Sequence, residues 1–113
     1  MTPSDRNREG QDALLGIDKI IHEPSRLLIM STLYVLEGAD FLFLLNQTGL
    51  TKGNLSAQLS KLEGAGYLTI VKGYAGKRPH TSLSLTEAGR KALAHYRYLM
   101  ERLLDDLPED VES

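Results

Sequence analysis

The segment from Thr51 to Gly66 constrains the fold more than any other part of the chain, because its pattern suits only one kind of helix. Thr51 is a good N-cap, since its hydroxyl can accept a backbone N–H of the first turn, and Gly66 can end a helix in the left-handed conformation. Between them Leu55, Leu59 and Leu62 recur at i, i+4 and i+7, so they share one narrow stripe. The pattern predicts a helix over residues 51–66 that is buried only along its leucines.

The opposite side of this predicted helix carries small and hydrogen-bonding residues without a carboxylate: Gly53, Asn54, Ser56, Ala57, Ser60 and Lys61. A helix in the major groove of DNA needs donors and acceptors for the base edges, and short side chains where the backbone approaches phosphate. An isolated polar stripe is more often an ordinary solvated helix face. The neighbouring segments are therefore needed to distinguish a DNA-binding helix from a solvated one.

The charges are distributed unevenly along the chain, although the net charge is only −2. Residues 1–51 carry four basic and seven acidic side chains, residues 52–97 carry eight and two, and residues 98–113 carry one and six, which gives net charges of −3, +6 and −5. Positive charge is thus concentrated on the segment that begins with the polar helix. A local basic patch is what binding to a polyanion requires, whatever the overall isoelectric point.

The segments before residue 51 predict two more helices. Pro24 suits the first turn of a helix that runs to about Glu37, and Asp40 is a suitable cap for a helix from Phe41 to about Gln47. Residues 48–50, Thr-Gly-Leu, are a tight connection into residue 51. Two helices joined by a short turn with a glycine form a helix-turn-helix, in which the second helix contacts the DNA bases.

The segment after residue 66 predicts a β-hairpin. Residues 67–74 are rich in β-branched and aromatic side chains, residues 81–85 alternate apolar and polar, and residues 75–80 form a loop with Gly, Pro, Lys77, Arg78 and His80. A helix-turn-helix followed by such a hairpin is a winged helix, and the basic loop could reach phosphate or the minor groove. The fold class predicted is therefore mainly α with a small β-hairpin (α+β), a winged helix-turn-helix.

Two terminal helices complete the prediction. Apolar residues at helical spacing indicate a helix over residues 11–21, and Thr86 caps a helix that ends near residue 107 with a heptad-spaced apolar stripe. This is more apolar surface than one small domain can cover, so both helices are expected to serve a homodimer. The expected interface residues are Leu14, Ile17, Ile21, Leu93, Tyr96, Met100, Leu103, Leu104 and Leu107. Residues 1–10 are expected to be flexible and residues 108–113 to be an acidic, solvated tail.

Other classes of function find little support. The chain has no cysteine, and its three histidines are far apart in the sequence, so we expect no metal site and no cofactor. No nucleophile–base–acid set indicates an enzyme. The polar N-terminus is unlike a signal segment and no apolar run is long enough to span a bilayer, which predicts a cytoplasmic protein without a membrane partner.

Residues 24–107 resemble the winged-helix transcriptional regulators related to the MarR, ArsR and PadR families, most closely the short single-domain type. The resemblance rests on TKGNLS at residues 51–56 continuing to GYL at residues 66–68, and on KRPHT at residues 77–81 leading to LTEAGR at residues 85–90. It implies a dimeric, sequence-specific DNA-binding protein, often a repressor. The MarR wing typically carries an acidic residue two before its arginine, where this chain has Gly76.

We therefore expect a regulator that binds a palindromic double-stranded DNA site as a homodimer. The larger relatives hold small ligands beside a longer dimerisation domain, which this chain lacks, so the sequence does not support an effector. The alternative is a winged-helix module for protein–protein interaction without sequence-specific DNA binding. The residues expected to contact DNA are Lys52, Gly53, Asn54, Ser56, Ala57, Ser60, Lys61, Lys72, Lys77, Arg78 and His80.

Overall fold

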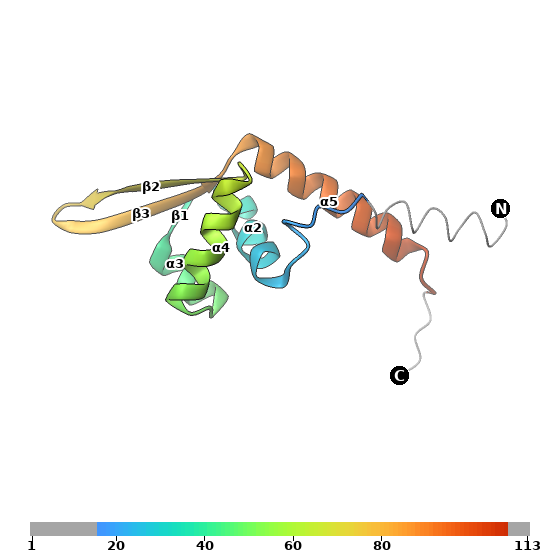
Figure 1. The fold of residues 1–113 in the computed structure, drawn as a ribbon, viewed down its shortest axis with the longest axis horizontal. Coiled ribbons are helices and arrows are strands. Elements are labelled where there is room, and N and C mark those ends of the chain that lie inside the picture. Colours follow the sequence, from blue (N-terminus) through green and yellow to red (C-terminus); the bar gives the residue numbers. More distant parts are fainter. Residues whose placement is uncertain (1–15, 109–113) are drawn as a thin grey trace.

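The computed structural model describes residues 16–108, which form four labelled helices and a three-stranded sheet (Figure 1). The elements, in chain order, are α2 (Pro24–Val35), β1 (Ala39–Asp40), α3 (Phe41–Thr48), α4 (Lys52–Gly64), β2 (Leu68–Ala75), β3 (Arg78–Leu85) and α5 (Glu87–Asp105). This is the α+β winged-helix fold that the sequence predicts. The hairpin of β2 and β3 projects from one end of the molecule and α5 runs toward the other (Figure 1).

The helix starts are set by side-chain caps, as the sequence predicts. The side-chain oxygens of Asp40, Thr51 and Thr86 accept the backbone N–H of the residue three positions on, at 2.7, 3.1 and 2.9 Å. Glu23 caps α2 in the same way, at 2.8 Å from the nitrogen of Arg26. Each cap satisfies a donor that the helix start leaves unpaired.

Two glycines turn the chain at the ends of α3 and α4. Gly49 has a φ of 70° and directs the chain into Thr51, and Gly66 has a φ of 81° just after α4. Side chains with a Cβ adopt this left-handed region only at a cost, so both turns favour glycine. The predicted helix-turn-helix is confirmed, with α2 ending two residues earlier than expected and α3 one residue later.

The hairpin is longer than predicted. The two strands pair from Leu68 with Leu85 out to Ala75 with Arg78, so only Gly76 and Lys77 form the turn and the predicted loop over residues 75–80 is wrong. Gly and Pro in this stretch indicated a loop. However, Pro79 lies outside the two residues of β3 that pair with β1. β3 has no neighbouring strand on that side at Pro79, so the missing N–H of the proline interrupts no strand pairing.

β1 is a strand at a place where the sequence predicts only the cap of a helix. Its two residues pair with the middle strand, Ala39 opposite Leu83 and Asp40 opposite Ser82, which gives the order β1-β3-β2. Two residues are too few for an alternating pattern, and Asp40 is also the cap of α3. Only the arrival of β3 from a distant part of the sequence makes this segment a strand.

The described part of the predicted first helix is not helical. Residues 11–15 lie outside the described residues, and residues 16–21 form a turn and a bend. The carboxylate of Asp18 accepts the backbone N–H groups of Ile20 and Ile21, at 2.8 and 3.4 Å, and so competes with helical hydrogen bonds. Ile17 and Ile21 nevertheless point into the core.

The core lies between α2, α3, α4, the inner half of the hairpin and the first half of α5, and the segment before α2 adds to it. Its members are Ile17, Ile21, Ile29, Met30, Leu33, Leu44, Leu55, Leu59, Leu62, Leu68, Leu83, Leu85 and Tyr96. The first turn of helix α5 is in close contact with the connection after α4. A Cβ at Gly89 would overlap the carbonyl oxygen of Tyr67, so the contact requires glycine. No helix of the described residues is long and apolar enough to cross a bilayer.

Candidate nucleic-acid interface

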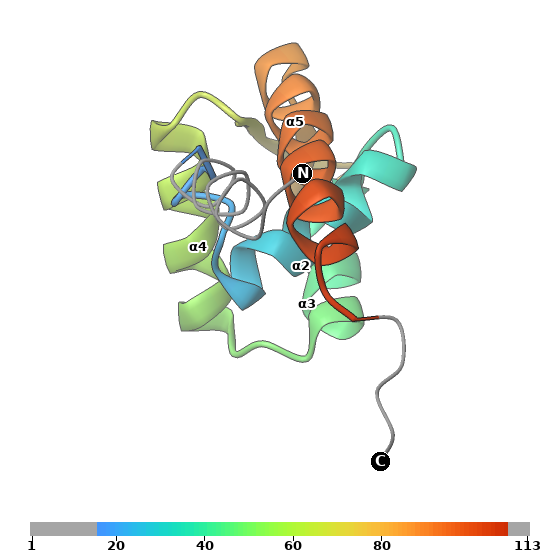
Figure 2. The ribbon, with the colours of Figure 1, turned by 90° about the vertical axis from the view of Figure 1, so that its right-hand side faces the viewer.

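Helix α4 packs on the core through its three leucines and leaves its other side free. Leu55, Leu59 and Leu62 are at most 3% exposed, whereas the predicted contact residues of this helix are all exposed: Lys52, Gly53, Asn54, Ser56, Ala57, Ser60 and Lys61. In Figure 2, α4 forms one side of the molecule, with no other labelled helix outside it. The helix is therefore placed so that an external surface can approach it along its length.

The exposed face of α4 has small residues along its centre and polar residues along its two edges. At 100° per residue, Gly53 and Ala57 point directly away from the leucine stripe, while Asn54 lies toward one edge and Ser56 and Ser60 toward the other. The helix has one carboxylate, Glu63, in its last turn. Small residues at the centre allow close approach, and the hydrogen-bonding groups stand on either side.

The edge with Asn54 is tied to α2 by two side chains that the sequence analysis did not single out. Arg26 donates from Nη1 to Oε1 of Gln58 over 2.9 Å, and Gln58 donates from Nε2 to Oδ1 of Asn54 over 2.9 Å. The i, i+4 spacing of Asn54 and Gln58 was visible in the sequence, but the partner on α2 was not.

The edge with Ser56 and Ser60 borders a hollow of about 320 Å³ between α4 and the hairpin. Its lining is partly apolar and partly polar: Phe41, Ser56, Leu59, Ser60, Ile70, Lys72 and Thr81. Thr81 is a polar group here that the sequence analysis did not predict as a site residue. The hollow brings Lys72 of β2 close to the two serines of α4, so part of the predicted set comes together in space.

The strand register divides the remaining hairpin residues between two faces. Lys72 opposite Thr81 lies two residues along from the pair of half-buried Ile70 and buried Leu83, on the face of the hairpin that continues the core. Arg78 and His80 lie at the alternate positions and so on the other face, and Lys77 lies in the turn. The predicted hairpin residues therefore do not form one patch, and they surround the outer half of the hairpin.

The cations of this surface have no carboxylate partner among residues 16–108. The three ion pairs found there join Arg26 to Glu23, Lys91 to Glu87 and Arg97 to Glu101. The five cations of α4 and the hairpin take part in none of them: Lys52, Lys61, Lys72, Lys77 and Arg78. Their positive charge thus remains available to a polyanion.

The surface expected at a dimer interface is only partly exposed. Leu104 and Leu107 near the end of α5 are 52% and 59% exposed, and Leu93, Met100 and Leu103 are half-buried against their own core. Leu14 lies outside the described residues.

Three of the expected interface residues have to be removed from that set. Ile17, Ile21 and Tyr96 are in the core of their own chain, and Tyr96 forms a hydrogen bond through its hydroxyl with Nδ1 of His22, at 2.9 Å. Their side chains have almost no surface left for a partner. The heptad spacing of Tyr96 is compatible with a place in the dimer interface or in the core. The folded chain places Tyr96 in its own core.

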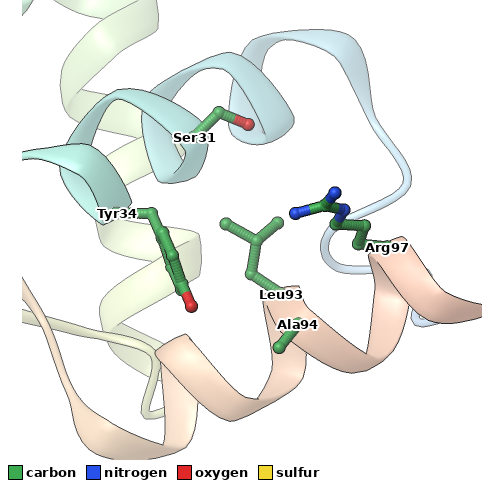
Figure 3. A pocket seen from close by; sticks show the side chains of 5 residues that line it. All are labelled: Ser31, Tyr34, Leu93, Ala94 and Arg97. Carbon is green, nitrogen blue, oxygen red and sulfur yellow. The ribbon is translucent and has the colours of Figure 1, made fainter.

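A groove between α2 and α5 opens beside this surface (Figure 3). It has a volume of about 390 Å³ and is lined by Ser31, Tyr34, Leu93, Ala94 and Arg97. Figure 3 shows Tyr34 and Leu93 on opposite walls, with the guanidinium of Arg97 reaching toward α2. Among residues 16–108, no three His, Cys, Asp or Glu side chains gather closely enough to hold a metal ion.

The fold and the exposed helix define this protein as a winged helix, and comparisons with known proteins agree. A family model described as a winged helix DNA-binding domain matches residues 25–104. The chain therefore belongs to the winged-helix DNA-binding family of transcriptional regulators. The uncharacterized protein MJ0432 of Methanocaldococcus jannaschii is 36% identical over 80 residues, which are 71% of this chain and 87% of that protein.

Solved structures show the same fold. The transcriptional regulator homologue protein from Pyrococcus horikoshii OT3 has a TM-score of 0.77 and 26% identity, covering 87% of this chain and 95% of that chain. Overoxidized AbfR bound to DNA has a TM-score of 0.63 and 19% identity, covering 90% of this chain and 70% of that chain. AbfR is one of several MarR-like regulators among the structural neighbours, which confirms the family resemblance at the level of the fold.

Proposed function

We propose that this chain is a homodimeric repressor that binds a palindromic site in double-stranded DNA. Helix α4 occupies the major groove, and the outer half of the hairpin contacts the adjacent backbone or minor groove. The observation that carries the proposal is the exposed face of α4, which has small residues at its centre, hydrogen-bonding edges and no carboxylate before the last turn. AbfR, which shares the fold, has been solved bound to DNA.

Base edges and phosphates are contacted by different parts of the surface. We assign Asn54, Ser56, Ser60 and Lys61 to base edges or nearby phosphates, because they stand at the rims of α4. The other polar residues of the predicted set approach the phosphates, and Gly53 and Ala57 at the centre of the face let α4 come close to the groove. The phosphate contacts are Lys52, Lys72, Lys77, Arg78 and His80. The two faces of the hairpin suit insertion into a groove, since each face then meets one wall.

In vitro selection from random double-stranded DNA, followed by a salt titration on the selected sequence, tests this function. We expect a palindromic consensus whose half-sites are about 34–36 Å apart, which is one turn of DNA. A winged helix that serves only protein–protein interaction should instead show weak, salt-sensitive binding and select no sequence. Such a result would reject the proposed function.

Two substitutions should have different effects on the selected site. Asn54→Ala should cost about 1–3 kcal/mol on that site and relax the sequence preference. Lys77→Ala should weaken binding to all sequences alike and reduce the slope of log K against log salt by about 1. Fluorescence anisotropy at several salt concentrations measures both quantities, and unchanged affinity and slope in both variants would contradict the assignment.

A further inference from the structure

A chain of hydrogen bonds connects the interior side of α2 with the exposed edge of α4. It runs from the guanidinium of Arg26 to the side-chain amide of Gln58 and on to that of Asn54. Arg26 itself is held firmly, because its Nε donates to the carbonyl oxygen of Ile20 over 2.6 Å and its side chain is only 11% exposed. Only the last member, Asn54, stands where a ligand of α4 would meet it.

The direction of this chain follows from the chemistry of arginine. A guanidinium has only donors, so the amide group of Gln58 must turn its oxygen toward Arg26 and its NH₂ toward Asn54. Asn54 must then turn its oxygen toward Gln58, which leaves its own NH₂ directed away from the chain. Without the arginine, both amides could rotate by half a turn and form the same bond in the opposite sense.

We propose that Arg26 and Gln58 are positioning residues that hold Asn54 as a hydrogen-bond donor toward the base edges. This rests on the proposed function. In the major groove, the edge that such a donor matches best carries acceptors, as guanine does with N7 and O6, whereas the N4 amino group of cytosine offers only a donor. Arg26 and Gln58 thereby influence which base is read without contacting it.

Gln58→Met and Gln58→Glu separate this role from a general effect on binding. Methionine has a similar length but forms neither hydrogen bond, so Asn54 becomes free to rotate. Glutamate still accepts from Arg26 but cannot donate to Asn54. It therefore requires Asn54 to donate inward and to present its oxygen to the DNA.

The test is selection from random DNA with the wild-type chain, Asn54→Ala, Gln58→Met and Gln58→Glu, after thermal melting has shown that each is folded. Asn54→Ala identifies the base position that Asn54 reads. At that position Gln58→Met should lose about tenfold in discrimination, and Gln58→Glu should shift the preference toward a base with a donor edge. The other positions of the site should keep their preferences in both variants.

A double variant distinguishes positioning from direct contact. In the Asn54→Ala background, Gln58→Met should cause no further change in preference, because Gln58 acts through Asn54. Preferences that stay unchanged in both Gln58 variants, or that still change in the Asn54→Ala background, would overturn the proposal while leaving DNA binding intact. A wild-type chain that selects no sequence would instead reject the proposed function.

Discussion

Gly53 lies at the centre of the exposed face of α4, and its lack of a side chain is not needed by the fold. A Cβ added there would meet no atom within 4 Å, and the same holds for Gly64 at the other end of the helix. Neither glycine has a positive φ. Glycine is a poor helix former, so its presence at residue 53 calls for another reason, and close approach to DNA is the one we propose.

Gly53→Ala should therefore separate stability from binding. The added methyl group should leave the free energy of unfolding unchanged or raise it by up to about 1 kcal/mol, because alanine favours the helix. It should at the same time weaken binding to the selected DNA site, since it stands between the helix and the groove. Urea unfolding and fluorescence anisotropy measure the two effects.

Gly64→Ala is the matched control for this substitution. It adds the same methyl group to the same helix, also in open space, but at the last residue of α4, beyond the proposed contacts at Ser60 and Lys61. We expect similar stability and unchanged DNA affinity. If Gly53→Ala binds DNA as well as Gly64→Ala does, the backbone of α4 does not approach the duplex at residue 53.

At the scale of the elements, the segment before α2 is attached to the connection between α4 and β2 by one side-chain pair. The hydroxyl of Tyr67 donates to the carboxylate of Asp18, whose other oxygen caps the turn at residues 20 and 21. The hydrogen bond to Asp18 raises the pKa of Tyr67 to about 12. Ile17 and Ile21 are carried into the core by the same segment.

This pair predicts a specific loss of stability in alkaline solution. The folded chain holds the proton of Tyr67 more tightly than the unfolded chain does, so the contribution is fully present below about pH 10 and is lost as the pH rises through about 12. Tyr67→Phe should lower the free energy of unfolding by about 1.5 kcal/mol at pH 8. The difference from the wild type should shrink between pH 10 and 12.

Denaturant unfolding of both proteins over this pH range measures the difference. Comparing the two proteins cancels the titration of the other tyrosines and of the lysines, which they share. If the two stability curves run parallel from pH 8 to pH 12, the bond to Asp18 does not set the pKa of Tyr67.

At the scale of the whole molecule, apolar side chains are left exposed on α5 and α2, and others on α3 and the hairpin. Tyr98 and Leu104 on α5 and Leu107 just after it are about half exposed, and Tyr34 and Val35 are exposed at the end of α2. The groove of Figure 3 lies between the two helices. A second copy packed along α5 would cover this surface, which is the dimer that we propose.

Leu104→Glu should convert that dimer into a monomer, because it places a charge in the proposed apolar interface. The palindromic site should then be bound much more weakly, while one half-site should bind with little change. Sedimentation at micromolar concentrations measures the association. Leu42→Glu on α3, at a leucine that is also exposed, is the control and should leave the dimer intact. A wild-type chain that sediments as a monomer would contradict the proposed dimer.

The amino-acid sequence by itself determined the local features of this protein. Caps at Asp40, Thr51 and Thr86, the left-handed glycines and the leucine stripe of α4 depend on residues within a few positions of one another, so their patterns could be recognised in the chain. The same patterns placed the exposed polar face on α4. They also placed the two helices before it in the correct order.

Only the tertiary structure decided the features that depend on distant partners. β1 exists because Leu83 and Ser82 pair with it, the hairpin extends through Pro79 because that part of β3 has an open edge, and Tyr96 is buried because the segment before α2 covers it. The orientation of Asn54 depends on Arg26, whose bond to Gln58 spans 32 positions. Such contacts leave no periodic pattern in a single sequence, because the two halves of each contact are brought together only when the chain folds.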